Sequence, residues 1–107
     1  MPITRIFRDT ILIRAKSDAE FRRLLLTEAV NELLTGDLEA GKAMLRDYIN
    51  ATITFQKLAA KMKKSSKSIH RMLGTKGNPT AVNILEMIKV LQAHEHIILQ
   101  VKAKRAA

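Results

Sequence analysis

The sequence lacks cysteine and tryptophan, and it has only three phenylalanines and one tyrosine among its 107 residues. Without cysteine there is no disulfide framework, no thiol nucleophile and no thiolate metal site. No apolar run approaches the roughly 20 residues that span a bilayer, and the first residues lack the apolar segment of a secretory signal. We therefore expect a soluble, cytoplasmic protein with no membrane partner, built around one core.

Acidic side chains are absent from a long stretch, between Asp47 and Glu86. Residues 1–53 carry eight basic and eight acidic side chains, so the whole net charge of +9 belongs to residues 54–107. A solvated surface usually mixes both signs, whereas a field of one sign attracts a polyanion. This distribution favours nucleic acid as the partner.

Side-chain sets typical of enzymes are also missing. The only candidates for metal or acid–base chemistry are His70, His94 and His96. His94 and His96 are two residues apart, which on a helix points them in different directions, and only Glu95 accompanies them. No glycine-rich loop has the spacing of a phosphate-binding loop, and nothing places a Ser–His–Asp set. The sequence predicts no enzyme, no metal site and no cofactor.

Apolar periodicity and capping residues predict an all-α fold, a compact helical bundle. The expected helices cover residues 4–16, 18–34, 38–50, 55–62, 66–73 and 81–93. For the first of these, a short strand at 11–13 is the alternative. The helix over 18–34 should end at Gly36 in a left-handed conformation. Because it is apolar over more than half its circumference, it is either central to the domain or in contact with a second subunit.

The last helix and the tail have different apolar patterns. The last helix has its apolar stripe at Ile84, Leu85, Ile88 and Leu91. In the tail 95–102, alternate residues are apolar at Ile97, Leu99 and Val101, which indicates a short C-terminal β-strand, with a final helical turn as the alternative. A lone strand has unpaired backbone groups, so its partner would be another copy or another protein.

Residues 54–73 have the pattern of two short amphipathic helices joined by a tight basic turn. Apolar residues recur at helical spacing, at Phe55, Leu58, Ala59 and Met62 in the first helix and at Ile69, Met72 and Leu73 in the second. A serine in the turn can cap the second helix. Lys67 and Arg71 lie opposite its apolar face, with His70 on the flank. A helix with a buried back and a cationic front has the form of a helix-turn-helix recognition element.

From residue 37 onward the chain resembles the helix-turn-helix family of lambda-repressor and Cro type, and most closely the prophage-derived, HigA-like antitoxins of bacterial addiction modules. The resemblance is carried by Phe55-x-x-Leu58-Ala59, by residues 65–73 ending Arg71-Met72-Leu73, by Gly77-Asn78-Pro79, and by the helix with Ile84, Leu85 and Leu91. Members commonly have glycine in the turn after the first helix, where this chain has Lys63 or Lys64. A lysine there must avoid the left-handed conformation or bear about 1 kcal/mol of strain.

The resemblance implies a dimeric DNA-binding protein that represses its own operon and binds a RelE-type ribonuclease toxin. Residues 37–107 would be the DNA-binding domain, and residues 1–36 a helical extension that forms a dimer or toxin interface. The alternative function is a protein-interaction module that neutralises a partner with little specific DNA binding.

The mechanism of DNA binding also follows from the residues themselves. The recognition helix would enter the major groove of a palindromic operator, with two such helices about 34 Å apart in a dimer. The side chains expected to reach base edges are those of Ser66, Lys67, His70 and Arg71. Contacts to phosphates, and the caps that hold the helices, are expected from Thr54, Gln56, Lys61, Lys63, Lys64, Ser65 and Lys76.

Overall fold

The computed structural model describes residues 5–107, and these form six α-helices with no strand among them. The helices are α1 (Arg5–Ser17), α2 (Ala19–Leu34), α3 (Leu38–Ala51), α4 (Phe55–Met62), α5 (Ser66–Leu73) and α6 (Ala81–Glu95). The all-α class is confirmed, and the first segment is helical rather than a strand; residue 4, where that helix was expected to begin, lies outside the described residues. No helix within residues 5–107 is long and apolar enough to cross a membrane.

The helix boundaries follow from capping side chains. The Asp18 carboxylate accepts a hydrogen bond from the backbone N–H of Phe21 at 3.0 Å, and this bond lowers the pKa of Asp18. Asp37 and Thr80 cap α3 and α6 in the same way. Gly36, which follows the C-cap Thr35 of α2, has φ 89°, as expected for a left-handed glycine. Local capping signals therefore account for most of the element boundaries.

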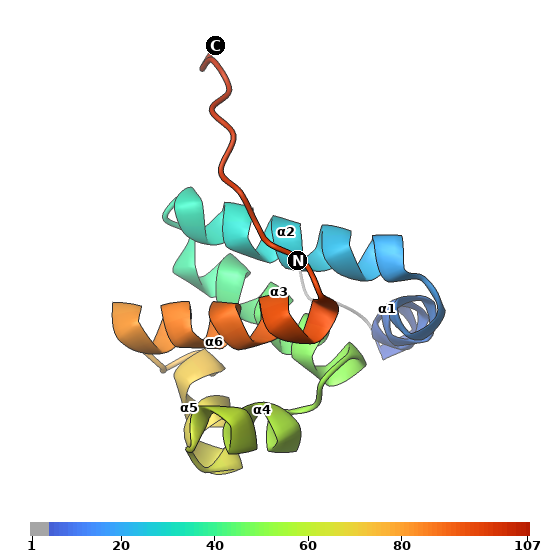
Figure 1. Ribbon diagram of the computed structural model, residues 1–107, viewed down its shortest axis with the longest axis vertical. Coiled ribbons are helices and arrows are strands. Elements are labelled where there is room, and N and C mark those ends of the chain that lie inside the picture. The colour runs from blue at the N-terminus through green and yellow to red at the C-terminus, as the bar shows by residue number, and fades with distance from the viewer. Residues whose placement is uncertain (1–4) are drawn as a thin grey trace.

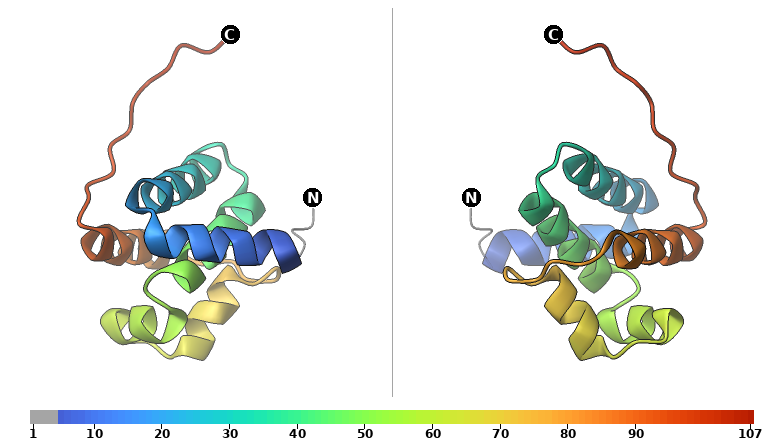
Figure 2. Two further views of the ribbon diagram at one scale, coloured as in Figure 1. Left: turned by 90° about the vertical axis from the view of Figure 1, so that its right-hand side faces the viewer. Right: turned by 90° about the vertical axis from the view of Figure 1, so that its left-hand side faces the viewer.

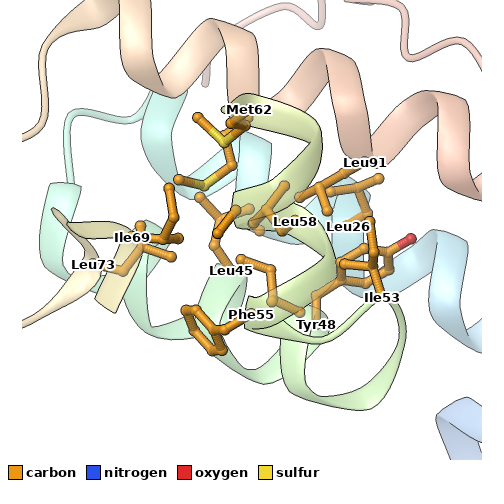
Figure 3. Close-up of a cluster of buried hydrophobic side chains, with 14 residues drawn as sticks. Leu26, Leu45, Tyr48, Ile53, Phe55, Leu58, Met62, Ile69, Leu73 and Leu91 are labelled. Carbon is orange, nitrogen blue, oxygen red and sulfur yellow. The ribbon is translucent and has the colours of Figure 1, made fainter. Parts of the chain in front are cut away.

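The buried core draws side chains from every helix between α2 and α6. Leu26, Leu45, Leu58 and Leu91 lie in one contiguous apolar cluster, which Figure 3 shows closing around the inner face of α4. The predicted stripe of α6 was wrong at one position: Leu85 is 65% exposed, whereas Met87 is buried. The reason is that α6 turns the face of Met87 and Leu91 toward the rest of the molecule, so Leu85 is left on the outer side.

The tail after α6 is neither strand nor helix, so both predictions for it were wrong from residue 97 onward. His96 adopts the left-handed conformation, with φ 58°, and ends α6. The N–H of Ile97 then bonds back to the carbonyl of Gln92 at 3.1 Å, which is the closing bond of a helix C-terminus. The chain continues extended, with no strand beside it among the described residues. In Figures 1 and 2 it leaves the molecule at the end opposite α4 and α5.

A buried ionic network joins the helices outside the α4–α5 pair. The Glu95 carboxylate in α6 accepts hydrogen bonds from Arg22 Nε of α2, at 3.2 Å to each oxygen, and from the Tyr48 hydroxyl of α3 at 2.6 Å. Arg22 also donates to the carbonyl of Ala15 in α1 at 2.8 Å. Burial, and then the bond to Glu95, raise the pKa of Tyr48. Four helices thus share one polar contact point, which no pattern in the sequence predicted.

Candidate nucleic-acid interface

The α4–turn–α5 segment has the boundaries predicted for it, because both helices begin at a capping side chain. Thr54 Oγ1 accepts from the N–H of Lys57 at 3.4 Å, and Ser65 Oγ accepts from the N–H of Ser68 at 3.0 Å. Leu58 on α4 and Ile69 on α5 are fully buried. Figures 1 and 2 show the two short helices side by side at one end of the molecule. The opposite face of α5 is therefore presented outward.

The turn between α4 and α5 places a lysine where glycine would be unstrained. Lys63 ends α4 in the left-handed conformation, with φ 56° and ψ 42°. The N–H of Lys64 bonds back to the carbonyl of Ala59 at 2.9 Å, which closes the turn in the manner of a glycine-ended helix. Of the two outcomes expected for a lysine here, the structure takes the strained one.

Replacing Lys63 with glycine should stabilise the protein. Glycine occupies the left-handed region without the clash that costs an L-residue roughly 1–2 kcal/mol, and part of that gain is lost to the greater freedom of glycine in the unfolded chain. We expect K63G to raise the free energy of unfolding by about 0.5–1 kcal/mol in urea denaturation. The control is K61G, which removes the same charge inside α4 and should lower it by about 1 kcal/mol. Equal losses in both variants would contradict the prediction.

The outward face of α5 carries three polar side chains. Lys67, His70 and Arg71 are all exposed, and their spacing of three and four residues puts them on one face of the helix. The His70 ring stacks on Phe55 at the start of α4, with ring centroids 3.9 Å apart and an interplanar angle of 16°. This stack restrains the plane of the imidazole of an exposed residue.

The other side chains predicted to contact DNA lie around this face and differ in how exposed they are. Thr54, Gln56, Lys63 and Lys76 are exposed, whereas Lys64 and Ser66 are half-buried. The hydroxyls of Thr54 and Ser65 serve as helix caps, so their role is to hold the helices. Thr54 does so with φ 78°, a strained value for a β-branched residue.

A cavity of about 260 Å³ lies beside α5 and is open to solvent. Its lining joins the end of α5 to the following turn and the start of α6, and it includes Ser68, Arg71, Lys76, Thr80 and Asn83. Two cationic and three hydrogen-bonding side chains around one hollow suit an anionic group. Lys76 and Arg71 thus line one cavity, although the two belong to different elements.

The basic side chains of this region are uncompensated. Among the side chains of residues 9–107, the described ion pairs include Arg14–Asp18, Arg22–Glu95 and Lys42–Glu39. Within that part of the chain no ion pair includes any of the cations of α4, α5 and their turns, which are Lys57, Lys61, Lys63, Lys64, Lys67, Arg71 and Lys76. An unpaired group of like charges at one end of a molecule produces the potential that attracts a polyanion.

Two cations behind α5 were not identified from the sequence. Lys42 and Arg46 of α3 donate to backbone carbonyls at the end of α5 and in the next turn. Backbone carbonyls are present at every residue, so no sequence pattern marks them as partners. In the described part of the chain, no group of three or more His, Asp or Glu side chains is arranged to hold a metal ion.

Comparisons with protein-family models, with curated proteins and with solved structures gave no match to this chain.

Proposed function

We propose that this protein is a sequence-specific DNA-binding regulator in which α4 and α5 form a helix-turn-helix and α5 is the recognition helix. One observation carries the proposal. The inner face of α5 is anchored in the core by Ile69 and Leu73, while its outer face offers Lys67, His70 and Arg71 without an ion pair among the described residues. A rigid helix with a free cationic face is suited to the major groove.

The side chains divide into those that suit base edges and those that suit phosphates. Arg71 can bond both O6 and N7 of a guanine, and Lys67 and His70 offer further donors to base edges. The exposed lysines of the turns, Lys63 and Lys76, lie on either side of α5 in the sequence and suit phosphates, which fix register without reading sequence. Specificity for a DNA sequence would then come from α5, and affinity from the lysines of the flanking turns.

A salt titration tests this function. The wild-type protein is used to select duplexes from a random library, and Kd is measured for the selected duplex over a range of salt concentrations. We expect log K to fall linearly with log salt, with about −0.9 of slope for each phosphate contacted. Absence of binding to every duplex at low salt would refute the proposed function.

We assign the dimer interface of this regulator to the extended tail. Ile98 and Val101 are 84% and 81% exposed. Within residues 98–102, the backbone N–H of Leu99 donates a hydrogen bond to Gln92 Oε1 at 2.8 Å. The other backbone N–H groups of this segment have no hydrogen-bond partner in the described chain. Two such tails, lying antiparallel about a two-fold axis, would cover each other's exposed apolar side chains. Antiparallel pairing keeps Lys102, Lys104 and Arg105 of the two copies apart, whereas parallel pairing would bring like charges together.

Charging the tail should separate the dimer. In I98K/V101K two lysines replace the exposed apolar side chains, and like charges brought together across the interface are unfavourable. We expect the variant to sediment as a monomer and to lose at least tenfold in affinity for the selected palindrome. The control is V82K, the same kind of change at an exposed position of α6. A variant that remains dimeric would locate the interface elsewhere.

The antitoxin role is a further part of the proposal, and it is supported by the outer side of α2. Leu24 and Leu34 of α2 are both more than half exposed, and large exposed apolar side chains on one helix suit a protein partner. A small toxin-like reading frame beside this gene, whose toxicity co-expression of this protein relieves, would support the role. An isolated gene would favour a plain regulator.

A further inference from the structure

Lys42 is a lysine with no exposed surface. Its side chain is fully buried on the inner side of α3, and its ammonium lies 2.8 Å from the carbonyl oxygens of both Gly74 and Gly77 and 2.8 Å from Glu39 Oε1. A buried ammonium is unfavourable unless its donors are satisfied. An ammonium has three donors, and here each has an acceptor. Such a complete set of partners indicates a specific role for this side chain.

The two carbonyls belong to the turn that follows α5. The N–H of Gly77 bonds to the carbonyl of Gly74 at 2.9 Å, which closes the turn. A Cβ on Gly77 would stand 2.1 Å from the carbonyl oxygen of Arg71 and 2.5 Å from that of Met72. The backbone of the turn therefore lies directly against the last turn of α5. Whatever holds this turn also holds the C-terminal end of the helix.

Arg46 acts on the same end of α5. It lies one helical turn after Lys42 on α3, and its Nη1 donates to the carbonyl of Leu73, the last residue of α5. Both cations thus stand at the end of α5 where the helix dipole is negative. The N-terminal end of α5 is held separately, by the cap of Ser65. The two ends of α5 are therefore held by different hydrogen bonds, those of Lys42 and Arg46 at one end and the Ser65 cap at the other.

We propose that Lys42 and Arg46 are positioning residues for DNA recognition, an inference that rests on the proposed function. Together they fasten α5 and the turn 74–77 to α3, and so set where Arg71 and Lys76 stand relative to the DNA. Neither needs to touch DNA. Without Lys42 the carbonyl of Gly77 loses its donor and that of Gly74 keeps only the N–H of Gly77. The turn then opens to admit water, and α5 is free to tilt about its capped end. Base contacts depend on this geometry, whereas attraction to phosphates depends mainly on charge.

The test compares K42M with the wild type on two duplexes of equal length, the one that the wild type selects and a scrambled one. Methionine fills the buried volume but donates no hydrogen bond. Kd values are corrected for the folded fraction measured by circular dichroism. We expect affinity for the selected duplex to fall tenfold or more, and affinity for the scrambled duplex to change less than threefold. E39Q, which leaves the two carbonyl bonds in place, should keep the wild-type ratio.

A second readout separates positioning from mere stability. R71A should weaken selected-duplex binding tenfold or more in the wild type but less than threefold in the K42M background, because a misplaced Arg71 contributes little. If K42M does not fold, R46M tests the same role. Arg46 is the second cation that bonds to this end of α5, and it is only half-buried. An unchanged ratio between the two duplexes, or an undiminished effect of R71A, overturns the positioning role while the proposed function stands. A wild-type protein that binds no duplex overturns both.

Discussion

Reversing two charges on α5, in the variant K67E/R71E, is expected to abolish specific DNA binding while leaving the fold intact. Both side chains are exposed and make no ion pair among the described residues, so the substitution breaks no ion pair there. A good bidentate contact to a base is worth about 1–3 kcal/mol, and carboxylates facing the groove add repulsion. We therefore expect at least about a 100-fold loss of affinity for the selected duplex, measured by fluorescence anisotropy, with an unchanged thermal midpoint.

The matched control for this variant is K16E/K89E. Lys16 and Lys89 are also exposed but belong to α1 and α6, so the net charge changes by the same amount at sites away from α5. If binding depended only on overall charge, the two double variants would behave alike. Equal losses of affinity would therefore contradict the assignment of α5 as the recognition helix.

Removing the Glu95 carboxylate is expected to cause the largest loss of stability. In E95A, Arg22 loses its ion pair and the Tyr48 hydroxyl loses its acceptor. The Glu95 side chain is 5% exposed and that of Arg22 is 25% exposed, so the pair is largely buried. Removing one partner of a buried ion pair typically costs about 3–5 kcal/mol. For a domain of this size each kcal/mol lowers the thermal midpoint by about 4 °C or more. Calorimetry of E95A against the wild type measures the loss.

The control for E95A is E28A, the same substitution at an exposed position of α2, which should change the midpoint little. The network also has a pH signature. The raised pKa of Tyr48 means that the folded state favours the neutral phenol; the resulting stability is complete below about pH 10, near the ordinary tyrosine pKa, and is lost at higher pH. Y48F should therefore lose less stability above pH 10 than the wild type. A loss below about 1 kcal/mol in E95A would show that the network stabilises little.

The helices could be predicted from the sequence wherever a local signal and the core agreed. The bounds of α5 were predicted correctly because Ser65 offers a cap and Ile69 and Leu73 both face inward. The exposure of Lys67 and Arg71 followed from the same periodicity. The stacking of His70 on Phe55 was not predicted, since it depends on how closely α4 and α5 approach across the strained turn.

The parts that the sequence could not predict depend on distant partners. Alternation in the tail indicated a strand, but a strand needs a neighbour, and residues 5–107 contain none. Leu85 fits a helical stripe as well as Met87 does, and packing against other helices decided between them. Lys42 and Glu95 have the appearance of surface residues in a sequence, because their partners other than Glu39 lie 32 to 73 residues away.

The contact between the turn 74–77 and α5 also constrains how the sequence can diverge. Position 77 has no room for any side chain while the turn lies on the carbonyl of Arg71, so glycine should persist there in every homologue that keeps this turn. Lys42 donates to this turn, so loss of glycine at 77 should be accompanied by loss of lysine at 42. If α5 is the recognition helix, the bases that it contacts can meanwhile change through substitutions at Lys67 and Arg71 alone. New operators would then be recognised while Lys42 and the turn 74–77 stay unchanged.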